Sequence, residues 1–176
     1  MYFEHALKYF NLWDLHPLDI PLPHKAQISK YKELLMEEEA QFMVDKPFCL
    51  LLGTLLWGSS STWPNISYVC NILGQVQVNP VLEHWELLLE VCHYICGILD
   101  YSLLYFLSLG EEVGDGIKLF GCIDTDWAGC VNIYCSISEY VFFMGRVPIS
   151  WSSKQQAVVA LSLIELEYIS LVYAAQ

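Results

Sequence analysis

Positive charge is scarce in this sequence. Its 176 residues include 8 Lys and Arg in total against 20 Asp and Glu, Arg146 is the single arginine, and the net charge is −12. Proteins that bind nucleic acids normally show a basic face or stripe that neutralises phosphates. The composition therefore argues against binding of RNA, DNA or an RNA–DNA hybrid by this chain.

Long hydrophobic runs are missing as well. Residues 47–82 contain no charged residue and no histidine, but Gly53, the serines at 59–61, Pro64 and Gly74 interrupt the stretch. Its longest apolar piece has about eleven residues, whereas a membrane-spanning helix needs about twenty. We expect buried helices here and no membrane partner.

The sequence also lacks a secretion signal and a disulfide framework. Its seven cysteines are odd in number and follow no regular spacing, and the start "MYFEHALKYF" has no basic segment followed by an apolar run. We expect free thiols and an intracellular protein, in the cytoplasm or nucleus, that is not secreted.

Hydrophobic residues make up 55% of the chain, so a core can form. Apolar spacing predicts helices at 1–12, 47–58, 65–77 and from about 80 to 97. Three prolines within "HPLDIPLPH" predict an extended connector. Residues 30–43 are expected to form either a solvated helix or a flexible loop.

A polar, glycine-rich break at 110–116 separates this helical part from a region in which the apolar period is two. Strands are predicted at 117–124, 140–145 and 147–153, followed by a helix from about Leu163 to the end. Ser162 and Glu165 have the spacing of a capping box. The fold class expected is α+β, with the boundary between residues 115 and 116.

Carboxylates gather where the first strand ends. Alternation places Phe120, Cys122, Asp124 and Asp126 on one side of that strand. Aspartate is a common turn former, so one interpretation is structural, whereas the other is that these carboxylates hold a divalent cation. On the last helix, Glu167 has no local role, and its partner is expected to be a cation, a distant lysine or water.

The motifs are similar to those of one family. "GCIDTDWAGC" resembles the Asp-Ala-Asp-Trp-Ala-Gly opening of the RNase H domain in copia-type retrotransposon Pol polyproteins. Residues 139–176 resemble its continuation, with the Ser-Trp-Ser-Ser-Lys and Glu-x-Glu-Tyr signatures in register. Residues 50–73 and 79–105 resemble the segment after the polymerase palm, and "FNLWDLHPLDIPLP" resembles the start of that tail.

The resemblance implies two parts. Residues 1–115 would be the mostly helical C-terminal tail of a reverse transcriptase-like region, and residues 116–176 the N-terminal half of an RNase H-like domain, with three antiparallel strands and a helix. It implies that Asp124 and Glu167 are catalytic carboxylates close in space, which hold Mg²⁺ with Asp126 nearby, and that the family's substrate is an RNA–DNA hybrid.

Departures from the family change the expected function. The family site needs two further acidic or histidine positions, which do not precede Gln176. We therefore expect a remnant of a Pol polyprotein that is inactive and does not bind Mg²⁺ tightly. The alternative is a small acidic protein-interaction module derived from the element. An open edge on the first strand is also expected to allow self-association.

Replacements within the motifs share a direction. The family's Arg-Ser-Thr-Ser-Gly corresponds to residues 135–139, where Cys135 stands for arginine and Glu139 for glycine. Each of these changes follows from a single C-to-T or G-to-A substitution. Our hypothesis is cytosine deamination in a silenced element.

Overall fold

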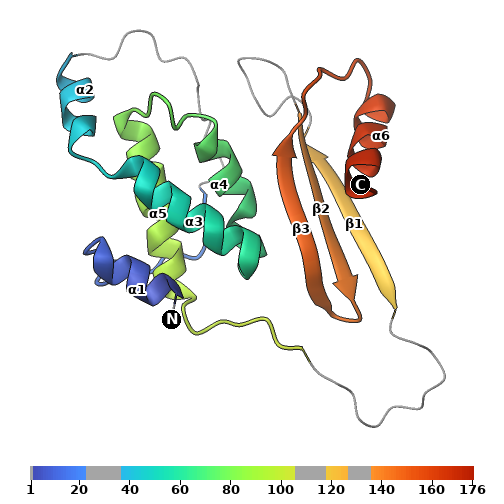
Figure 1. Ribbon diagram of the computed structural model, residues 1–176, viewed down its shortest axis with the longest axis horizontal. Helices are drawn as coiled ribbons and strands as arrows, with labels where there is room; N and C mark the ends of the chain where they lie inside the picture. The colour runs from blue at the N-terminus through green and yellow to red at the C-terminus, as the bar shows by residue number, and fades with distance from the viewer. Residues whose placement is uncertain (1, 23–36, 106–117, 127–135) are drawn as a thin grey trace. The chain divides into compact units, whose positions relative to one another are not determined.

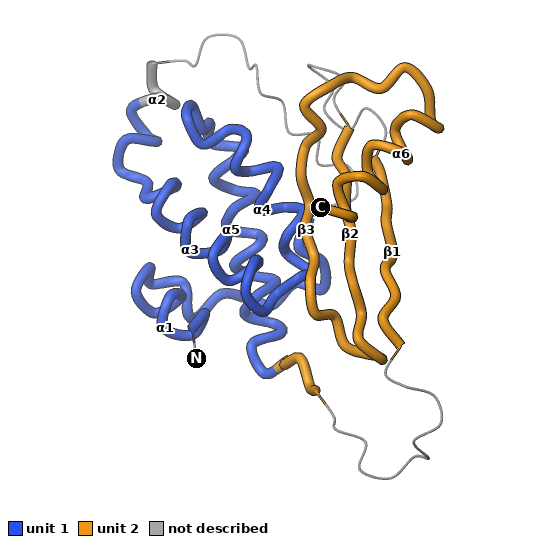
Figure 2. The backbone as a smooth tube through the Cα atoms, turned by 45° about the vertical axis from the view of Figure 1, so that its right-hand side comes forward, with its two compact units in different colours: residues 1–100, 130–132 blue, residues 101–129, 133–176 orange. Residues whose placement is uncertain are grey.

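The protein's computed structural model describes residues 2–22, 37–105, 118–126 and 136–176. These residues form two compact units, the first within residues 1–100 and the second within residues 101–176 (Figure 2). The predicted boundary at residue 116 lies outside the described residues. Helices and one three-stranded antiparallel sheet together confirm the α+β class.

The first unit is helical, as the sequence predicts (Figure 1). The helix predicted at 65–77 is too long at both ends, because Pro64–Ile66 forms a separate 3-10 turn and the α-helix that follows ends at Gly74. The elements of this unit are α1 (Tyr2–Tyr9), α2 (Glu37–Val44), α3 (Phe48–Ser61), the turn η1 (Pro64–Ile66), α4 (Ser67–Gly74) and α5 (Leu82–Gly97).

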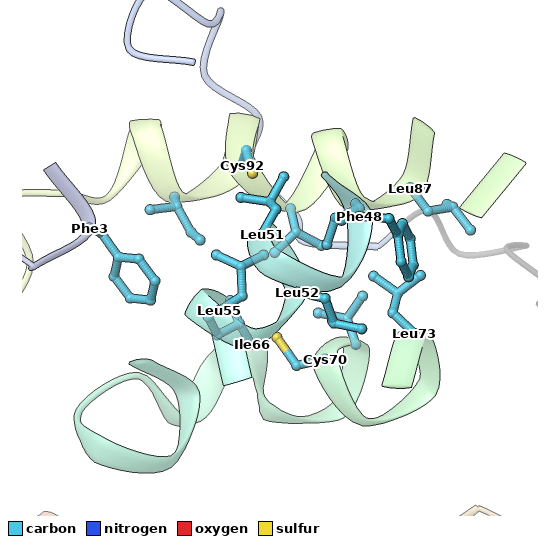
Figure 3. Packing of buried hydrophobic residues seen from close by; sticks show 14 of the residues in the cluster. Phe3, Phe48, Leu51, Leu52, Leu55, Ile66, Cys70, Leu73, Leu87 and Cys92 are labelled. Carbon is cyan, nitrogen blue, oxygen red and sulfur yellow. The ribbon is translucent and has the colours of Figure 1, made fainter. Parts of the chain in front are cut away.

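The core of the first unit lies where α3, α4 and α5 meet. Figure 3 shows Leu51, Leu52 and Leu55 of α3 packed among side chains of the other two helices. Each of these leucines is 1% exposed, and a fully buried leucine contributes roughly 1.5–3 kcal/mol. Helices α3 and α4 supply much of this core, which agrees with the lack of charged residues over 47–82.

Helix α1 packs against the core through the aromatic ring of Phe3. Phe3 is 3% exposed and packs edge-on against Trp63, with ring centroids 5.0 Å apart. Its ring lies directly on the backbone of α3, since a Cβ atom built on Gly58 would stand 2.0 Å from Cζ of Phe3. Glycine at position 58 is thus required by the close approach of α1.

The second unit is an antiparallel sheet with one helix: β1 (Leu119–Asp126), β2 (Ile137–Met144), β3 (Val147–Gln155) and α6 (Leu163–Ala174). The strand order is β1-β2-β3. The β2–β3 connection is tight, and Gly145 adopts a φ of 66°, which glycine tolerates best. In this sheet β1 is an outer strand, and no other described strand pairs with its free edge. The prediction of an open edge requires this arrangement.

Helix α6 packs against β1 and β2 through polar as well as apolar side chains (Figure 1). The hydroxyl oxygens of Ser138 and Ser170 lie 2.7 Å apart, and Gln156 Nε2 donates to Ser138 Oγ at 2.9 Å. Nearby, the rings of Tyr140 and Tyr173 pack edge-to-face with centroids 5.6 Å apart. These contacts fix which face of the sheet α6 covers.

The start of α6 confirms the predicted cap, with one difference. Ser162 Oγ accepts the N–H of Glu165 at 3.2 Å, as a capping residue does. Glu165 Oε2 accepts the N–H of Leu161 at 2.9 Å, one residue before the position expected for a capping box. Both carboxyl and hydroxyl therefore satisfy backbone donors.

Within the described ranges, no helix combines the length and the apolar character needed to cross a bilayer.

Candidate functional site

The carboxylates of β1 lie on the sheet face opposite α6. Asp124 pairs directly with Glu139 of β2, which in turn pairs with Ser153 of β3. Ser138 and Tyr140, the neighbours of Glu139 along β2, both contact α6. Since successive side chains alternate between faces, Glu139 and Asp124 point away from that helix.

Apolar residues share this face, as predicted from the alternation in β1. The rings of Phe120 and Phe143 stack there with centroids 5.1 Å apart. Cys122 lies between Phe120 and Asp124 on the same side of the strand, opposite Val141. The candidate site is therefore an exposed strip that runs from aromatic rings to carboxylates.

Asp124 has a local hydrogen bond. Its Oδ1 accepts the N–H of Thr125 at 2.8 Å. The N–H of Gly145 donates to the carbonyl of Lys118, so even-numbered residues of β1 bond to β2 and odd-numbered ones direct their backbone groups to the outer edge. The carboxylate of Asp124 thus accepts a hydrogen bond from one of the backbone N–H groups on the outer edge of β1.

Glu139 is a site residue that the sequence did not point to directly. Burial raises the pKa of its carboxyl, a hydrogen bond with Ser153 lowers it, and the charges of Asp124 and Asp126 raise it further. Its Oε1 atom is buried and has no hydrogen-bond partner in the described part of the chain. The available signal was the replacement of the family's glycine by glutamate at this position.

Glu167 belongs to the opposite side of the sheet. It is exposed on α6, the helix that covers the other face. No hydrogen bond or ion pair between described residues joins it to Asp124, and their approach in space stays a prediction. Residues 2–22, 37–105, 118–126 and 136–176 contain no group of three or more His, Cys, Asp or Glu placed to hold a metal ion. They do not by themselves fit a site for two Mg²⁺ ions about 4 Å apart.

Replacing Glu139 with glutamine should stabilise the second unit at neutral pH. Like charges directly opposite each other in a sheet are destabilising, by roughly 0.2–1 kcal/mol. Because the folded-state pKa of Glu139 is raised, its cost is present above that pKa and disappears as the pH falls below the unfolded-state value. The gain in stability from Glu139→Gln should therefore also disappear as the pH falls.

Urea unfolding across the acid-to-neutral range, with amide exchange of β2 peptides as a local probe, measures this effect. Glu86→Gln is the matched control, because it removes the same charge from an exposed position on α5. Equal pH profiles for the two variants would contradict the prediction.

Comparison with known proteins gives several matches over this chain. It is 31% identical over 169 residues to a retrovirus-related Pol polyprotein from transposon TNT 1-94 of Nicotiana tabacum, covering 96% of this chain and 12% of the relative. It is 38% identical over 107 residues to a Pol polyprotein from transposon RE2 of Arabidopsis thaliana, covering 61% of this chain and 7% of the relative. An uncharacterized mitochondrial protein of Arabidopsis thaliana is 30% identical over 174 residues, covering 99% of this chain and 67% of that protein.

The chain thus spans about a tenth of the length of the Pol polyproteins that it matches. No protein-family model matches it. No solved structure is similar to it either.

Proposed function

This chain belongs to the Pol polyproteins of copia-type retrotransposons, and we propose that it is a remnant joining two of their parts. Residues 1–115 correspond to the tail of a reverse transcriptase-like region, and residues 116–176 to the first half of an RNase H-like domain. As it stands, the chain does not cleave RNA.

The order of elements in the second unit carries the RNase H-like assignment. A strand bearing Asp124 is followed by two antiparallel strands and then by a helix bearing Glu167. This is the order that the resemblance implies for the start of a site in which clustered carboxylates hold two cations. The identities to Pol polyproteins support the same assignment over the whole chain.

Two observations support the absence of activity. Asp124 is opposed by the carboxylate of Glu139, whose buried oxygen adds negative charge where the family has a glycine. In addition, 20 acidic residues against 8 basic ones repel a polyanionic hybrid. Mg²⁺ would be offered Asp124 with Asp126 nearby, and an ion that keeps most of its water binds such a pair loosely.

A second candidate function is protein contact. Several large apolar side chains of α6 face solvent: Leu163 is 52% exposed, Ile164 81% and Tyr168 66%. Exposed apolar surface of this kind is typical of interaction sites. It favours the alternative of a small acidic interaction module over an active nuclease.

The test is cleavage of a labelled RNA–DNA hybrid by the full chain with Mg²⁺ or Mn²⁺. We expect equal background for the natural chain and for Asp124→Asn, because no two-ion clamp forms. Glu139→Gly, which restores the family residue, should also stay at background if the site needs ligands beyond Asp124 and Glu167. Metal-dependent cleavage that disappears in Asp124→Asn would overturn the proposal.

A further inference from the structure

The solvent face of α3 carries apolar side chains and no charge. One face of this helix supplies leucines to the core of the first unit. On the outward face Trp57 is 65% exposed and Leu50 is 56% exposed. None of the 14 residues of α3 is Asp, Glu, Lys, Arg or His. A helix that is apolar on all sides is typically covered on all sides, so this outward face is a candidate for contact with another protein surface.

The outward residues of α3 alternate in size. Leu50, Gly53, Trp57 and Ser60 are all exposed, and they recur at the three- and four-residue spacing of a seam between paired helices. Large side chains at 50 and 57 thus alternate with small ones at 53 and 60. A Cβ atom built on Gly53 meets nothing within 4 Å, so the space above this position is open.

We propose that this face binds the same face of a second copy of the chain. The two α3 helices lie antiparallel about a twofold axis between residues 53 and 57. Trp57 of each copy then packs on Gly53 of the other, and Leu50 packs on Ser60. Each layer pairs a large side chain with a small one, as close packing requires. The assembly stops at a dimer because both copies use the same face.

Other arrangements of the two helices lose this match of sizes. Parallel helices would set Trp57 against Trp57 and Gly53 against Gly53, which overfills one layer and leaves a void in another. A shift of the antiparallel pair by one turn sets Leu50 on Trp57 in one direction. In the other direction it sets Trp57 on itself. The order of large and small residues therefore selects one register.

Charge favours association through α3. Each copy has 20 acidic and 8 basic residues, all of them outside this helix, so contact through α3 brings no two carboxylates together. The apolar surface of α6 lacks this advantage, because Glu167 is exposed on the same helix. Antiparallel packing also places the partially positive N-terminal end of one α3 beside the partially negative C-terminal end of the other.

The hydroxyl groups of α3 keep their hydrogen bonds when this face is covered. Thr54 Oγ1 donates to the carbonyl of Leu50 at 2.9 Å. The hydroxyls of Ser60 and Ser61 both donate to the carbonyl of Trp57, at 3.0 and 2.8 Å. Bonds of this kind within one helix do not depend on water, so a partner can displace the solvent without leaving these groups unsatisfied.

The available area predicts a weak dimer. Tyr2 of α1 extends the apolar face, since its hydroxyl donates to the carbonyl of Thr54 at 3.2 Å. The exposed parts of Tyr2, Leu50, Leu56 and Trp57 amount to roughly 500 Å² per copy, so two copies bury roughly 1,000 Å², the lower limit for a specific interface. At low micromolar concentration we therefore expect single chains.

Sedimentation equilibrium of the full chain, from micromolar to near-millimolar concentration, tests the proposal. We expect a monomer–dimer equilibrium that tightens with salt, because screening weakens the repulsion between two chains of net charge −12. Trp57→Ala should weaken the dimer at least tenfold, as removal of a central tryptophan usually does. Gly53→Trp should weaken it to a similar extent by overfilling its layer. The double variant exchanges the large and small positions and should restore association.

Leu50→Glu should abolish the dimer, because it places a charge in each half of the interface. Val78→Glu is the matched control, since Val78 is 93% exposed and lies outside α3, and it should leave the equilibrium unchanged. The helical circular dichroism signal should be the same for all variants, since every altered position is exposed.

Three results would contradict the proposal. The first is a chain that stays monomeric over the whole concentration range. The second is a dimer that Trp57→Ala strengthens, because it would have parallel helices with the two tryptophans opposed. The third is a dimer that Leu50→Glu leaves unchanged, which would place the contact elsewhere, for example on α6 or at the outer edge of β1.

Discussion

Replacing Gly58 with alanine should lower the free energy of unfolding of the helical unit by about 2 kcal/mol, which is typical of overpacking. The new methyl group would overlap the ring of Phe3, which is buried and would have to shift out of its packed position. Urea unfolding followed by the helical circular dichroism signal measures this loss.

Gly53 offers a matched control in the same helix. A Cβ atom there meets nothing within 4 Å. Gly53→Ala should therefore stabilise the unit by up to about 1 kcal/mol, the usual gain of alanine over glycine inside a helix. A double-mutant cycle completes the argument, because in a Phe3→Ala background the penalty of Gly58→Ala should vanish. A penalty that persists without the ring would show that the close approach is not its cause.

Replacing Gln156 with glutamate should destabilise the second unit by about 3 kcal/mol at neutral pH, as expected for an uncompensated buried charge. Gln156 is 7% exposed, and its Nε2 donates to Ser138 Oγ, to Ser170 Oγ at 3.3 Å and to the carbonyl of Leu166 at 3.4 Å. A carboxylate of the same shape has no donor and faces the Leu166 carbonyl with a like charge.

The loss should shrink in acid. Burial disfavours the ionised carboxyl, so its pKa in the folded state would lie above that in the unfolded state. The destabilisation is then complete above the folded-state pKa and disappears below the unfolded-state pKa. Amide exchange of β2 and α6 peptides at several pH values measures it. Gln176→Glu adds the same charge at an exposed position of this unit and should change little; a loss independent of pH would argue against a buried charge.

Sequence patterns placed the ends of both helices and strands to within about three residues. Helix α3 begins after Pro47 and α5 after Pro80, and these prolines with the apolar spacing place both helices within about three residues. Strand β2 was predicted from residue 140, whereas it begins at Ile137. The reason is Ser138, a polar residue that is buried because α6 supplies Ser170 as its partner. Such a contact between distant segments has no local signal.

In the candidate site, too, patterns within one strand were predictable from the sequence, whereas contacts between strands were not. Alternation within one strand placed Asp124 and Asp126 on the same side as Phe120, and the pairing in the sheet agrees. That Asp124 meets Glu139 depends on the register between β1 and β2, and a shift of one residue would place Glu139 on the other face. The period of two predicts a strand but not its register.

The rate at which the buried thiols of the helical unit react reports how often this unit opens. Burial raises the pKa of Cys70 and of Cys92 to about 12, so at pH 8 only roughly one in ten thousand of these groups is a reactive thiolate. Cys49, exposed in the same unit, and Cys122, exposed in the other, stand free at the surface. An alkylating reagent should react with the exposed thiols first. The later reaction of Cys70 and Cys92 then reports how often this unit opens. Mass spectrometry resolves that reaction for each cysteine, and no engineered label is needed.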